Sequence, residues 1–337
     1  MDNIRIGVLC PSEIAFRRFM PALKKTANFS YVGLAAATED EFYGNGSNNI
    51  VASELEKANN FISAHGGKLF SGYESLVSSD EIDAVYIPLP PALHYKWAKA
   101  ALENGKHVLL EKPFTTDVND TKALIDIANE RQLAVHENYM FAYHSQLEWI
   151  IKKIADGAIG DVRLIRIDFG FPFRGGNDFR YNKALGGGAL LDCGGYTVKL
   201  AGMLLGDSAR VVTSQLNSKD GFEVDIYGSA TLVNDDGLTA QISFGMDNSY
   251  KCSLEVWGST GTLFTGRVLT APDGFEPTVT IKTADGEETF TLPADDTFKK
   301  SIEYFANCVN DASLRVKHYD EIIKQSQQIN LIQKVEK

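Results

Sequence analysis

The sequence predicts an α/β chain in which a doubly wound parallel-sheet domain precedes an α+β domain with a mostly antiparallel, open sheet. In the first part, short apolar runs alternate with segments of helical periodicity, the pattern of βαβ units. In the second part, several strand-like stretches follow one another, separated by turns such as Asp235-Asp236-Gly237, which favours antiparallel pairing. We therefore expect a Rossmann-type domain over residues 1–140 and an α+β domain over 141–337, with a C-terminal helix packing back on the first domain.

The expected elements of the first domain follow from apolar spacing and turn residues. Polar residues rich in Gly and Asn predict a loop over 39–49, and Gly105 suits the left-handed end of a helix. The expected strands are 4–9, 31–36, 84–89, 107–110 and 133–137. The expected helices are 13–27, 51–65, 93–103 and 117–131.

The second domain is expected to pair a sheet with helices on one face. The expected helices are 145–156 and 189–205, and the expected strands are 162–171, 209–216, 222–233, 239–247, 253–257 and 262–265. Apolar residues occupy both alternations of these strands, so a sheet covered on one side only would expose a large apolar surface. We therefore expect a homo-oligomer, a dimer or tetramer, joined through that face. The residues concerned include Phe222, Val224, Ile226, Tyr227, Ile242, Phe244 and Trp257.

Composition excludes several classes of partner. The formal net charge is -11, and Lys and Arg form no cluster, which argues against nucleic acid as a partner. The sequence shows neither a signal peptide nor an apolar run of membrane-spanning length. The four cysteines are widely spaced without a C-x-x-C pair, and the six histidines lack metal-ligand spacing. We expect a cytoplasmic protein that has no metal site and does not associate with a membrane.

The first strand leads into a turn that resembles an altered dinucleotide fingerprint. Cys10, Ser12 and Ala15 stand where G-x-G-x-x-G/A would place its small residues. Ser12 is expected either to cap the following helix or to offer its hydroxyl to a phosphate. Cys10 is interpreted as a small turn residue rather than a reactive thiol. Ligands of such sheets bind at the carboxyl ends of the strands, so we expect Cys10, Ser12, Glu13 and Ile14 to contact a cofactor.

An ordered set of motifs then points to a family. Pro88-Leu89-Pro90-Pro91-Ala92-Leu93-His94 follows one strand, and Glu111-Lys112-Pro113 follows the next. The set resembles the Gfo/Idh/MocA oxidoreductases over nearly the whole chain. It continues through the segments Glu137-Asn138-Tyr139-Met140-Phe141, Gly157-Ala158-Ile159-Gly160, Gly186-Gly187-Gly188-Ala189-Leu190-Leu191-Asp192-Cys193-Gly194-Gly195-Tyr196 and Gly258-Ser259-Thr260-Gly261-Thr262-Leu263.

The resemblance implies a nicotinamide cofactor held at these motifs. It places Glu111 and Lys112 beside the nicotinamide, with a cis peptide at Pro113. It also implies cofactor contacts for Ala37, Leu89, Pro90, His94, Asn138 and Arg180. NADP is favoured slightly over NAD, because no acidic residue stands at the expected end of the second strand, unless Glu39 or Asp40 serves there, and because Arg17 and Arg18 could reach a 2′-phosphate. Without the resemblance, the simplest interpretation is that these charges, Lys106, Glu111 and Lys112, are solvated in loops. His94 would then be a helix-cap or surface residue.

The reacting groups are expected at Lys112, Asp192 and Tyr196. A helix over 189–205 puts Asp192 and Tyr196 on one face at i and i+4. Many relatives carry His where this chain has Tyr196, and the Tyr variant is similar to dimeric dihydrodiol dehydrogenases and sugar 3-ketoreductases. Tyr196 would donate a proton, the Lys112 charge would lower its pKa, and Asp192 would orient a polyol. A buried core tyrosine is the structural alternative.

The sequence therefore predicts an NAD(P)-dependent oxidoreductase that moves a hydride between nicotinamide and a sugar or polyol carbonyl or alcohol. Two alternatives stay open, a trans-dihydrodiol dehydrogenase and a non-catalytic cofactor-binding regulator or assembly subunit.

Overall fold

The computed structural model describes residues 3–41 and 48–334. Contacts divide the chain into two compact units. Unit 1 comprises Met1–Asn138 and Phe298–Ile323, and unit 2 comprises Tyr139–Thr297 and Lys324–Lys337. Residues 298–323, assigned from the sequence to the second domain, thus form part of unit 1. Most of the loop expected over 39–49 lies outside the described residues.

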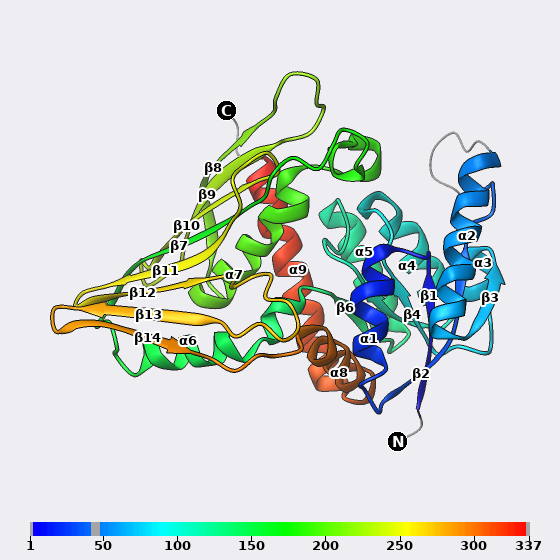
Figure 1. Cartoon of the computed structure of the whole chain (residues 1–337), viewed down its shortest axis with the longest axis horizontal. Helices are drawn as coiled ribbons and strands as arrows, with labels where there is room; N and C mark the ends of the chain where they lie inside the picture. The colour runs from blue at the N-terminus through cyan, green and yellow to red at the C-terminus, as the bar shows by residue number, and fades with distance from the viewer. Residues whose placement is uncertain (1–2, 42–47, 335–337) are drawn as a thin grey trace. The chain divides into compact units, whose positions relative to one another are not determined.

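Unit 1 contains a six-stranded parallel sheet in the order β3-β2-β1-β4-β5-β6 (Figure 1). Its strands are β1 (Ile4–Leu9), β2 (Phe29–Ala36), β3 (Lys68–Ser71), β4 (Ala84–Ile87), β5 (His107–Leu110) and β6 (Val135–Glu137). This is the strand order of a dinucleotide-binding domain, and the order reverses beside β1, where such sheets bind their ligand. The predicted parallel-sheet domain is confirmed.

The helices of unit 1 follow the predicted pattern with three differences, one of which is that the helix over 297–310 was not predicted. They are α1 (Met20–Leu23), α2 (Asn48–His65), α3 (Tyr73–Val77), α4 (His94–Glu103), α5 (Val118–Glu130), α8 (Thr297–Asn310, from its second residue) and the first half of α9 (Ala312–Lys334). Gly105 has φ 74°, which confirms the left-handed end predicted for α4. The helix expected over 13–27 begins with a π-helical turn, Ala15–Phe19, before α1. β3 and α3 were not predicted, because elements of four and five residues show too little periodicity.

Unit 2 contains an eight-stranded sheet in the order β14-β13-β12-β11-β7-β10-β9-β8. β7 and β10 pair in parallel and the other neighbours are antiparallel, so the predicted mostly antiparallel sheet is confirmed. Its strands are β7 (Val162–Gly170), β8 (Arg210–Asn217), β9 (Tyr227–Val233), β10 (Thr239–Gly245), β11 (Lys251–Gly258), β12 (Gly261–Gly266), β13 (Thr278–Thr283) and β14 (Gly286–Thr291). The helices α6 (Ser145–Ala155) and α7 (Gly195–Leu205) belong to this unit, and α7 packs on β7 and β10.

The strand expected over 222–233 was wrong at its start, because β9 begins at Tyr227. The preceding residues contact the segment that leads into α7 instead. The Asp225 carbonyl accepts from the amide of Ala189, and its carboxylate accepts from the amide of Leu190 over 2.7 Å. These bonds take the backbone of this segment out of the sheet and fix the start of the helix.

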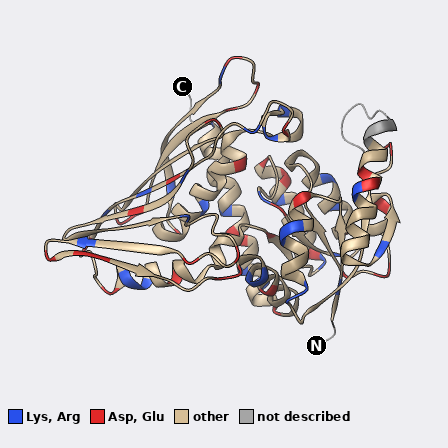
Figure 2. Cartoon of the chain, in the orientation of Figure 1, with Lys and Arg blue, Asp and Glu red and all other residues tan. Residues whose placement is uncertain are grey.

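Each unit has its own apolar core beneath its sheet. Both basic and acidic residues occur in each unit (Figure 2). In the part of the chain that the structure describes, no helix combines the length and the apolar character needed to cross a membrane.

Candidate active site

The carboxyl edge of the unit 1 sheet collects the predicted cofactor residues. Strands β1, β2, β4, β5 and β6 run parallel, so their C-terminal ends share one edge. The predicted residues that follow directly beyond these ends are Cys10, Ser12, Glu13, Ile14, Ala37, Leu89, Pro90, Glu111, Lys112 and Asn138, of which Glu13 and Ile14 already begin a helix. Arg180, predicted to join them, belongs to unit 2.

The turn after β1 adopts a backbone conformation typical of the glycine-rich dinucleotide fingerprint, although its residues are not glycines. Cys10 has φ 76°, the left-handed conformation that glycine adopts most easily. The Ser12 hydroxyl accepts from the Ala15 amide over 3.2 Å, so its helix-capping role is confirmed. Burial raises the pKa of the Cys10 thiol to about 12, in keeping with its interpretation as an unreactive turn residue. The turn and the strand order thus fit a dinucleotide, whose pyrophosphate such a turn would hold.

Glu111, at the end of β5, is a buried carboxylate with two donors. Its Oε1 accepts from the Tyr86 hydroxyl and from Asn138 Nδ2, both over 2.7 Å. Burial raises the pKa of Glu111, whereas these hydrogen bonds and the nearby Lys112 charge lower it. Lys106 is also buried and donates to the Ile82 carbonyl over 3.0 Å. The solvated-charge reading is therefore wrong for Glu111 and Lys106.

Two buried side chains hold the loop that carries Lys112. The Lys112–Pro113 peptide is cis, which confirms that expectation. His94 places one ring nitrogen 2.8 Å from the Pro113 carbonyl and the other 2.8 Å from the Leu89 carbonyl. Glu137 accepts from the Phe114 amide over 2.8 Å. Half-buried Lys112 thus stands on a backbone that side chains of α4 and β6 fix in place.

His94 itself is fully buried, so its surface reading is wrong. Burial lowers its pKa to about 4, although its two carbonyl neighbours favour the charged ring. Its contacts join the proline-rich turn after β4 to the loop after β5. An influence of His94 on a cofactor would therefore pass through the backbone of Leu89 and Pro113.

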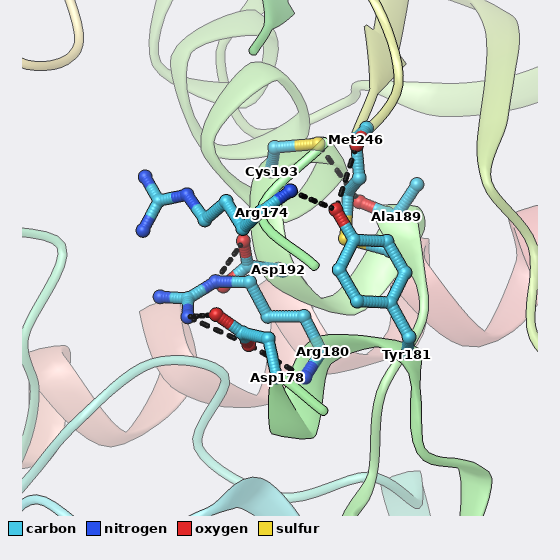
Figure 3. Close-up of polar contacts among 8 residues, drawn as sticks. All are labelled: Arg174, Asp178, Arg180, Tyr181, Ala189, Asp192, Cys193 and Met246. Carbon is cyan, nitrogen blue, oxygen red and sulfur yellow. Dashed lines mark hydrogen bonds and ion pairs between the residues drawn. The ribbon is translucent and has the colours of Figure 1, made fainter. Parts of the chain in front are cut away.

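The second cluster of predicted site residues lies in unit 2 and centres on Arg180. Its Nε donates to Asp192 Oδ2 over 2.9 Å, and its Nη1 lies 3.1 Å from Asp178 Oδ1. Figure 3 shows the guanidinium between the two carboxylates. Burial alone would lower the pKa of Arg180, but Asp192 and Asp178 raise it above its usual value. Arg180 is therefore a fixed cation that holds Asp192 in one orientation.

Glycines allow the chain to pass close to Arg180. A Cβ at Gly187 would lie 2.4 Å from the Arg180 carbonyl oxygen, closer than atoms can approach. The Gly188 amide donates to the same carbonyl over 2.9 Å. Tyr181 anchors the loop from the other side, because its hydroxyl donates to the Met246 carbonyl over 2.8 Å (Figure 3). The Gly-rich motif thus positions the arginine that contacts Asp192.

Tyr196 stands at the start of α7 within an aromatic cluster. Its ring lies 5.1 Å from that of Tyr139, 5.4 Å from that of Phe169 and 5.7 Å from that of Phe141. Residues 189–205 are helical as predicted, but Leu190–Gly194 form a π-helical turn. Such a turn shifts the i,i+4 spacing assumed for Asp192 and Tyr196, and π-turns are frequent at functional sites. The aromatic packing fixes the direction of the Tyr196 ring.

Sequence reasoning missed Tyr86 as a functional candidate. It lies in the middle of β4, where an aromatic residue is indistinguishable from ordinary core. The only signal in the sequence is its place one residue before the end of a strand that leads into the proline-rich turn. Its hydroxyl bond to Glu111 appears only in the folded chain.

Comparisons with known proteins agree with this arrangement. The model described as "Oxidoreductase family, NAD-binding Rossmann fold" matches residues 26–139, and the "GFO/IDH/MocA C-terminal domain" matches residues 148–264. The chain is 38% identical over 308 residues to a dTDP-3,4-didehydro-2,6-dideoxy-α-D-glucose 3-reductase of Actinomadura kijaniata, covering 91% of this chain and 88% of that one. It is 29% identical over 304 residues to a D-xylose 1-dehydrogenase (NADP⁺) of Haloferax volcanii, covering 90% and 88%.

A solved structure is similar over almost its full length. It is a 3-ketoreductase from Actinomadura kijaniata in complex with NADP and TDP-benzene, with TM-score 0.91, 36% identity and coverage of 99% of this chain and 98% of that one. The chain therefore belongs to the Gfo/Idh/MocA family of oxidoreductases. It is an NAD(P)-dependent enzyme of that family, with a Rossmann domain for the cofactor.

Proposed function

We propose that this enzyme reduces the keto group of a nucleotide-linked sugar with NADPH. The observation that carries the proposal is the 38% identity, over 91% of the chain, to a reductase named for a dTDP-linked keto-sugar. The similar structure that holds NADP and TDP-benzene supports the same class of cofactor and substrate. The proposal includes a cytoplasmic location, as expected from the sequence.

Lys112 and Tyr196 are proposed to act on the carbonyl oxygen of the substrate. The bound nicotinamide supplies the hydride, which adds to the carbonyl carbon. Tyr196 donates its phenolic proton to the oxygen as charge develops there, and the Lys112 ammonium stabilises that charge. The aromatic cluster around Tyr196 and the held loop around Lys112 would limit the motion of both groups. Solved structures of the Actinomadura 3-ketoreductase include variants with a replaced lysine or a replaced tyrosine, the same two residue types.

Asp192 is proposed to orient the sugar by accepting hydrogen bonds from its hydroxyl groups. Its carboxylate is largely buried, and one oxygen already receives Arg180 Nε. The fixed arginine holds the carboxylate in one orientation. Arg180 would then act through Asp192, in addition to any contact with cofactor.

NADP is proposed as the preferred cofactor. Binding of the ribose 2′-OH of NAD typically uses an acidic side chain after the second strand. Here Glu41 accepts from the amides of Thr38, Tyr73 and Glu74 over 2.8–3.0 Å, and these bonds lower its pKa although burial raises it. Glu41 is therefore engaged in capping α3. We also propose cofactor contacts for the other predicted residues, which are Cys10, Ser12, Glu13, Ile14, Ala37, Leu89, Pro90, Glu111, Lys112, Asn138 and Arg180. Buried His94 would act through the backbone of Leu89 and Pro113 instead.

A homo-oligomer is proposed through the open face of the unit 2 sheet. Trp257, Tyr227 and Phe264 share this face by strand alternation and are 53%, 48% and 47% exposed. Ile242 and Phe244, expected among the candidates, face the core instead. Exposed aromatic residues across neighbouring strands are typical of a surface that a second copy covers.

The proposal is tested by titrating the protein with NADPH and NADH, followed through nicotinamide fluorescence, and then assaying NADPH oxidation. The substrate panel contains dTDP-linked keto-sugars, free sugars and a trans-dihydrodiol. We expect saturable NADPH binding and turnover with a nucleotide-linked keto-sugar. Saturable binding without turnover of any of these compounds would favour the non-catalytic alternative. Absence of saturable binding of either nucleotide would overturn the proposal.

A further inference from the structure

Buried polar side chains of unit 1 form a chain that begins at Glu111. Asn138 Nδ2 donates to Glu111 Oε1 over 2.7 Å, and Asn138 Oδ1 lies 2.8 Å from the Ser301 hydroxyl of α8. The same hydroxyl lies 2.8 Å from Nε2 of His136 in β6. Because buried polar groups are costly unless paired, these contacts fix one another's geometry.

The chain continues from His136 to the surface of α9. His136 Nδ1 lies 3.0 Å from His318 Nε2, and the two rings are stacked at 4.9 Å. His318 Nδ1 lies 3.1 Å from Oε2 of Glu321, whose side chain is 39% exposed. Asn138, Ser301, His136 and His318 are each at most 2% exposed. A hydrogen-bonded path thus connects Glu111, next to Lys112, to a carboxylate at the protein surface.

The direction of each bond follows from the Glu111 end. An ionised carboxylate can only accept, so Asn138 turns its NH₂ group toward Glu111 and its carbonyl oxygen toward Ser301. The Ser301 hydroxyl then donates its single proton to Asn138, so it must accept a hydrogen bond from His136 Nε2. His136 therefore carries its proton on Nε2, and its bare Nδ1 accepts from His318 Nε2.

The same logic determines the charge of His318. Its Nε2 carries a proton for His136, while its Nδ1 faces the Glu321 carboxylate, which can only accept a hydrogen bond. Both ring nitrogens then carry protons, so His318 is an imidazolium. With Glu111 protonated, the Asn138 amide can turn over and every bond can reverse, which leaves His318 neutral. The charge states of Glu111 and His318 are therefore coupled, as in other interacting titrating sites.

Three further titratable groups lie near His318 in the part of the chain that the structure describes, and none of them replaces this charge. Tyr304 and Cys308 of α8 and Arg315 of α9 lie nearby. Burial raises the pKa of Tyr304, and burial together with Glu321 raises that of Cys308 to about 12, so both stay neutral at ordinary pH. Arg315 donates to the carbonyls of Cys308 and Val309. His136 and Glu321 are the direct hydrogen-bonding partners of the His318 ring.

We propose that Asn138, Ser301 and His136 are positioning residues that couple protonation of His318 to the ionised state of Glu111 beside Lys112. The inference rests on the proposed role of Lys112 in the reaction. Glu111 is the residue next to Lys112, so its charge acts on the surroundings of the proposed site, and an intact chain keeps Glu111 ionised as long as His318 holds its proton. The pH profile of the reaction would then contain the ionisation of a residue on α9 that never touches substrate.

The first experiment follows the His318 ring by NMR across pH in full-length enzyme with NADPH. Glu111→Gln permits either direction of the hydrogen bonds along the chain of side chains, because a glutamine can turn its oxygen or its NH₂ toward Asn138. We expect His318 to lose its proton at a pH lower by about one unit or more in Glu111→Gln and Ser301→Ala, since a unit is the scale of one changed charged contact. Ser301→Thr, which keeps the hydroxyl, should restore the wild-type titration. Ser253→Ala removes a buried hydroxyl in unit 2 and serves as the matched control.

The second experiment records kcat against pH for the same variants, per folded enzyme. In Ser301→Ala the kcat–pH profile should shift to lower pH, as the His318 titration does, while the affinity for NADPH stays unchanged. Ser301→Thr should restore the wild-type profile. Identical His318 titrations in wild type and Glu111→Gln, or a Ser301→Ala effect on thermal stability alone, would overturn the inference. If no keto-sugar is turned over, the NMR result still decides the coupling, so the two proposals fail separately.

Discussion

Arg180 Nε lies 2.9 Å from Asp192 Oδ2, in a contact where both side chains are largely buried. We propose that this pairing orients the Asp192 carboxylate for hydrogen bonds from the hydroxyl groups of a sugar. Asp192→Asn should raise KM for the keto-sugar about tenfold or more, because a hydrogen bond to a charged group contributes about 1.5–3 kcal/mol. Steady-state kinetics per folded enzyme measure this. Asp161→Asn, in an exposed pair with Arg163, is the matched control. A KM equal to that of wild type would remove Asp192 from substrate binding.

Cys10 offers a test of the cofactor turn. Because its φ is 76°, a left-handed conformation, Cys10→Val should destabilise the fold by about 1–2 kcal/mol, as expected for a β-branched residue there. Cys10→Gly, which adopts this conformation freely, should bind NADPH as tightly as wild type. Urea unfolding and fluorescence titration check both statements. Weaker NADPH binding by the glycine variant would show that the cysteine side chain, rather than the backbone shape, matters.

The lowered pKa of His107 predicts how the free energy of unfolding depends on pH. Its Nδ1 accepts from the Ala134 amide over 2.8 Å, and burial, followed by Arg315, lowers its pKa to about 4. The unfolded side chain has a pKa of about 6.5, so between these values the unfolded chain holds a proton that the folded chain lacks. The stability from His107 is complete above pH 6.5 and falls as pH drops toward 4, by up to about 1.4 kcal/mol per pH unit.

His107→Asn should flatten that slope, because the Asn oxygen can still accept from Ala134 but does not titrate. Free energies of unfolding across the same pH window provide the measurement. His94, whose pKa burial also lowers to about 4, is unchanged in both proteins, so the difference isolates His107. Equal slopes in the two proteins would contradict the buried, neutral ring.

Trp257 tests the proposed assembly. It is 53% exposed on the open sheet face, and Trp257→Lys places a charge where a second copy would pack. Light scattering should show a dimer or tetramer for wild type and a smaller species for the variant. Leu55→Lys changes a 45% exposed apolar residue on α2 and should leave the mass unchanged. A wild-type monomer at micromolar concentration would refute the assembly.

The sequence revealed the fold where one face of an element is buried. In strands such as Ile4–Leu9, apolar residues are buried at every position except Arg5, so the sequence pattern indicates the strand. β13 and β14 were missed, because Thr, Lys and Glu dominate their sequences and their pairing comes from neighbouring strands. The π-turn at Leu190–Gly194 was also missed, since helical spacing alone does not reveal an extra residue in a turn.

For the site, the sequence indicated residues that belong to motifs and not those that support them. Lys112, Asp192 and Tyr196 stand in recognisable patterns. Tyr86 sits in an ordinary apolar strand, and Ser301 meets Asn138 across 163 residues of chain. Such non-local contacts carry no periodicity, so only the folded structure identifies them.

The most direct test of the account is kcat for Tyr196→Phe, per folded enzyme, with NADPH and a nucleotide-linked keto-sugar. The substitution removes one hydroxyl and keeps the ring that packs against Tyr139 and Phe169. If Tyr196 is the proton donor, kcat should fall by about a hundredfold to ten-thousandfold while NADPH affinity and thermal stability stay near wild type. A kcat within about threefold of wild type, far below the range of general acid catalysis, would contradict the proposed mechanism.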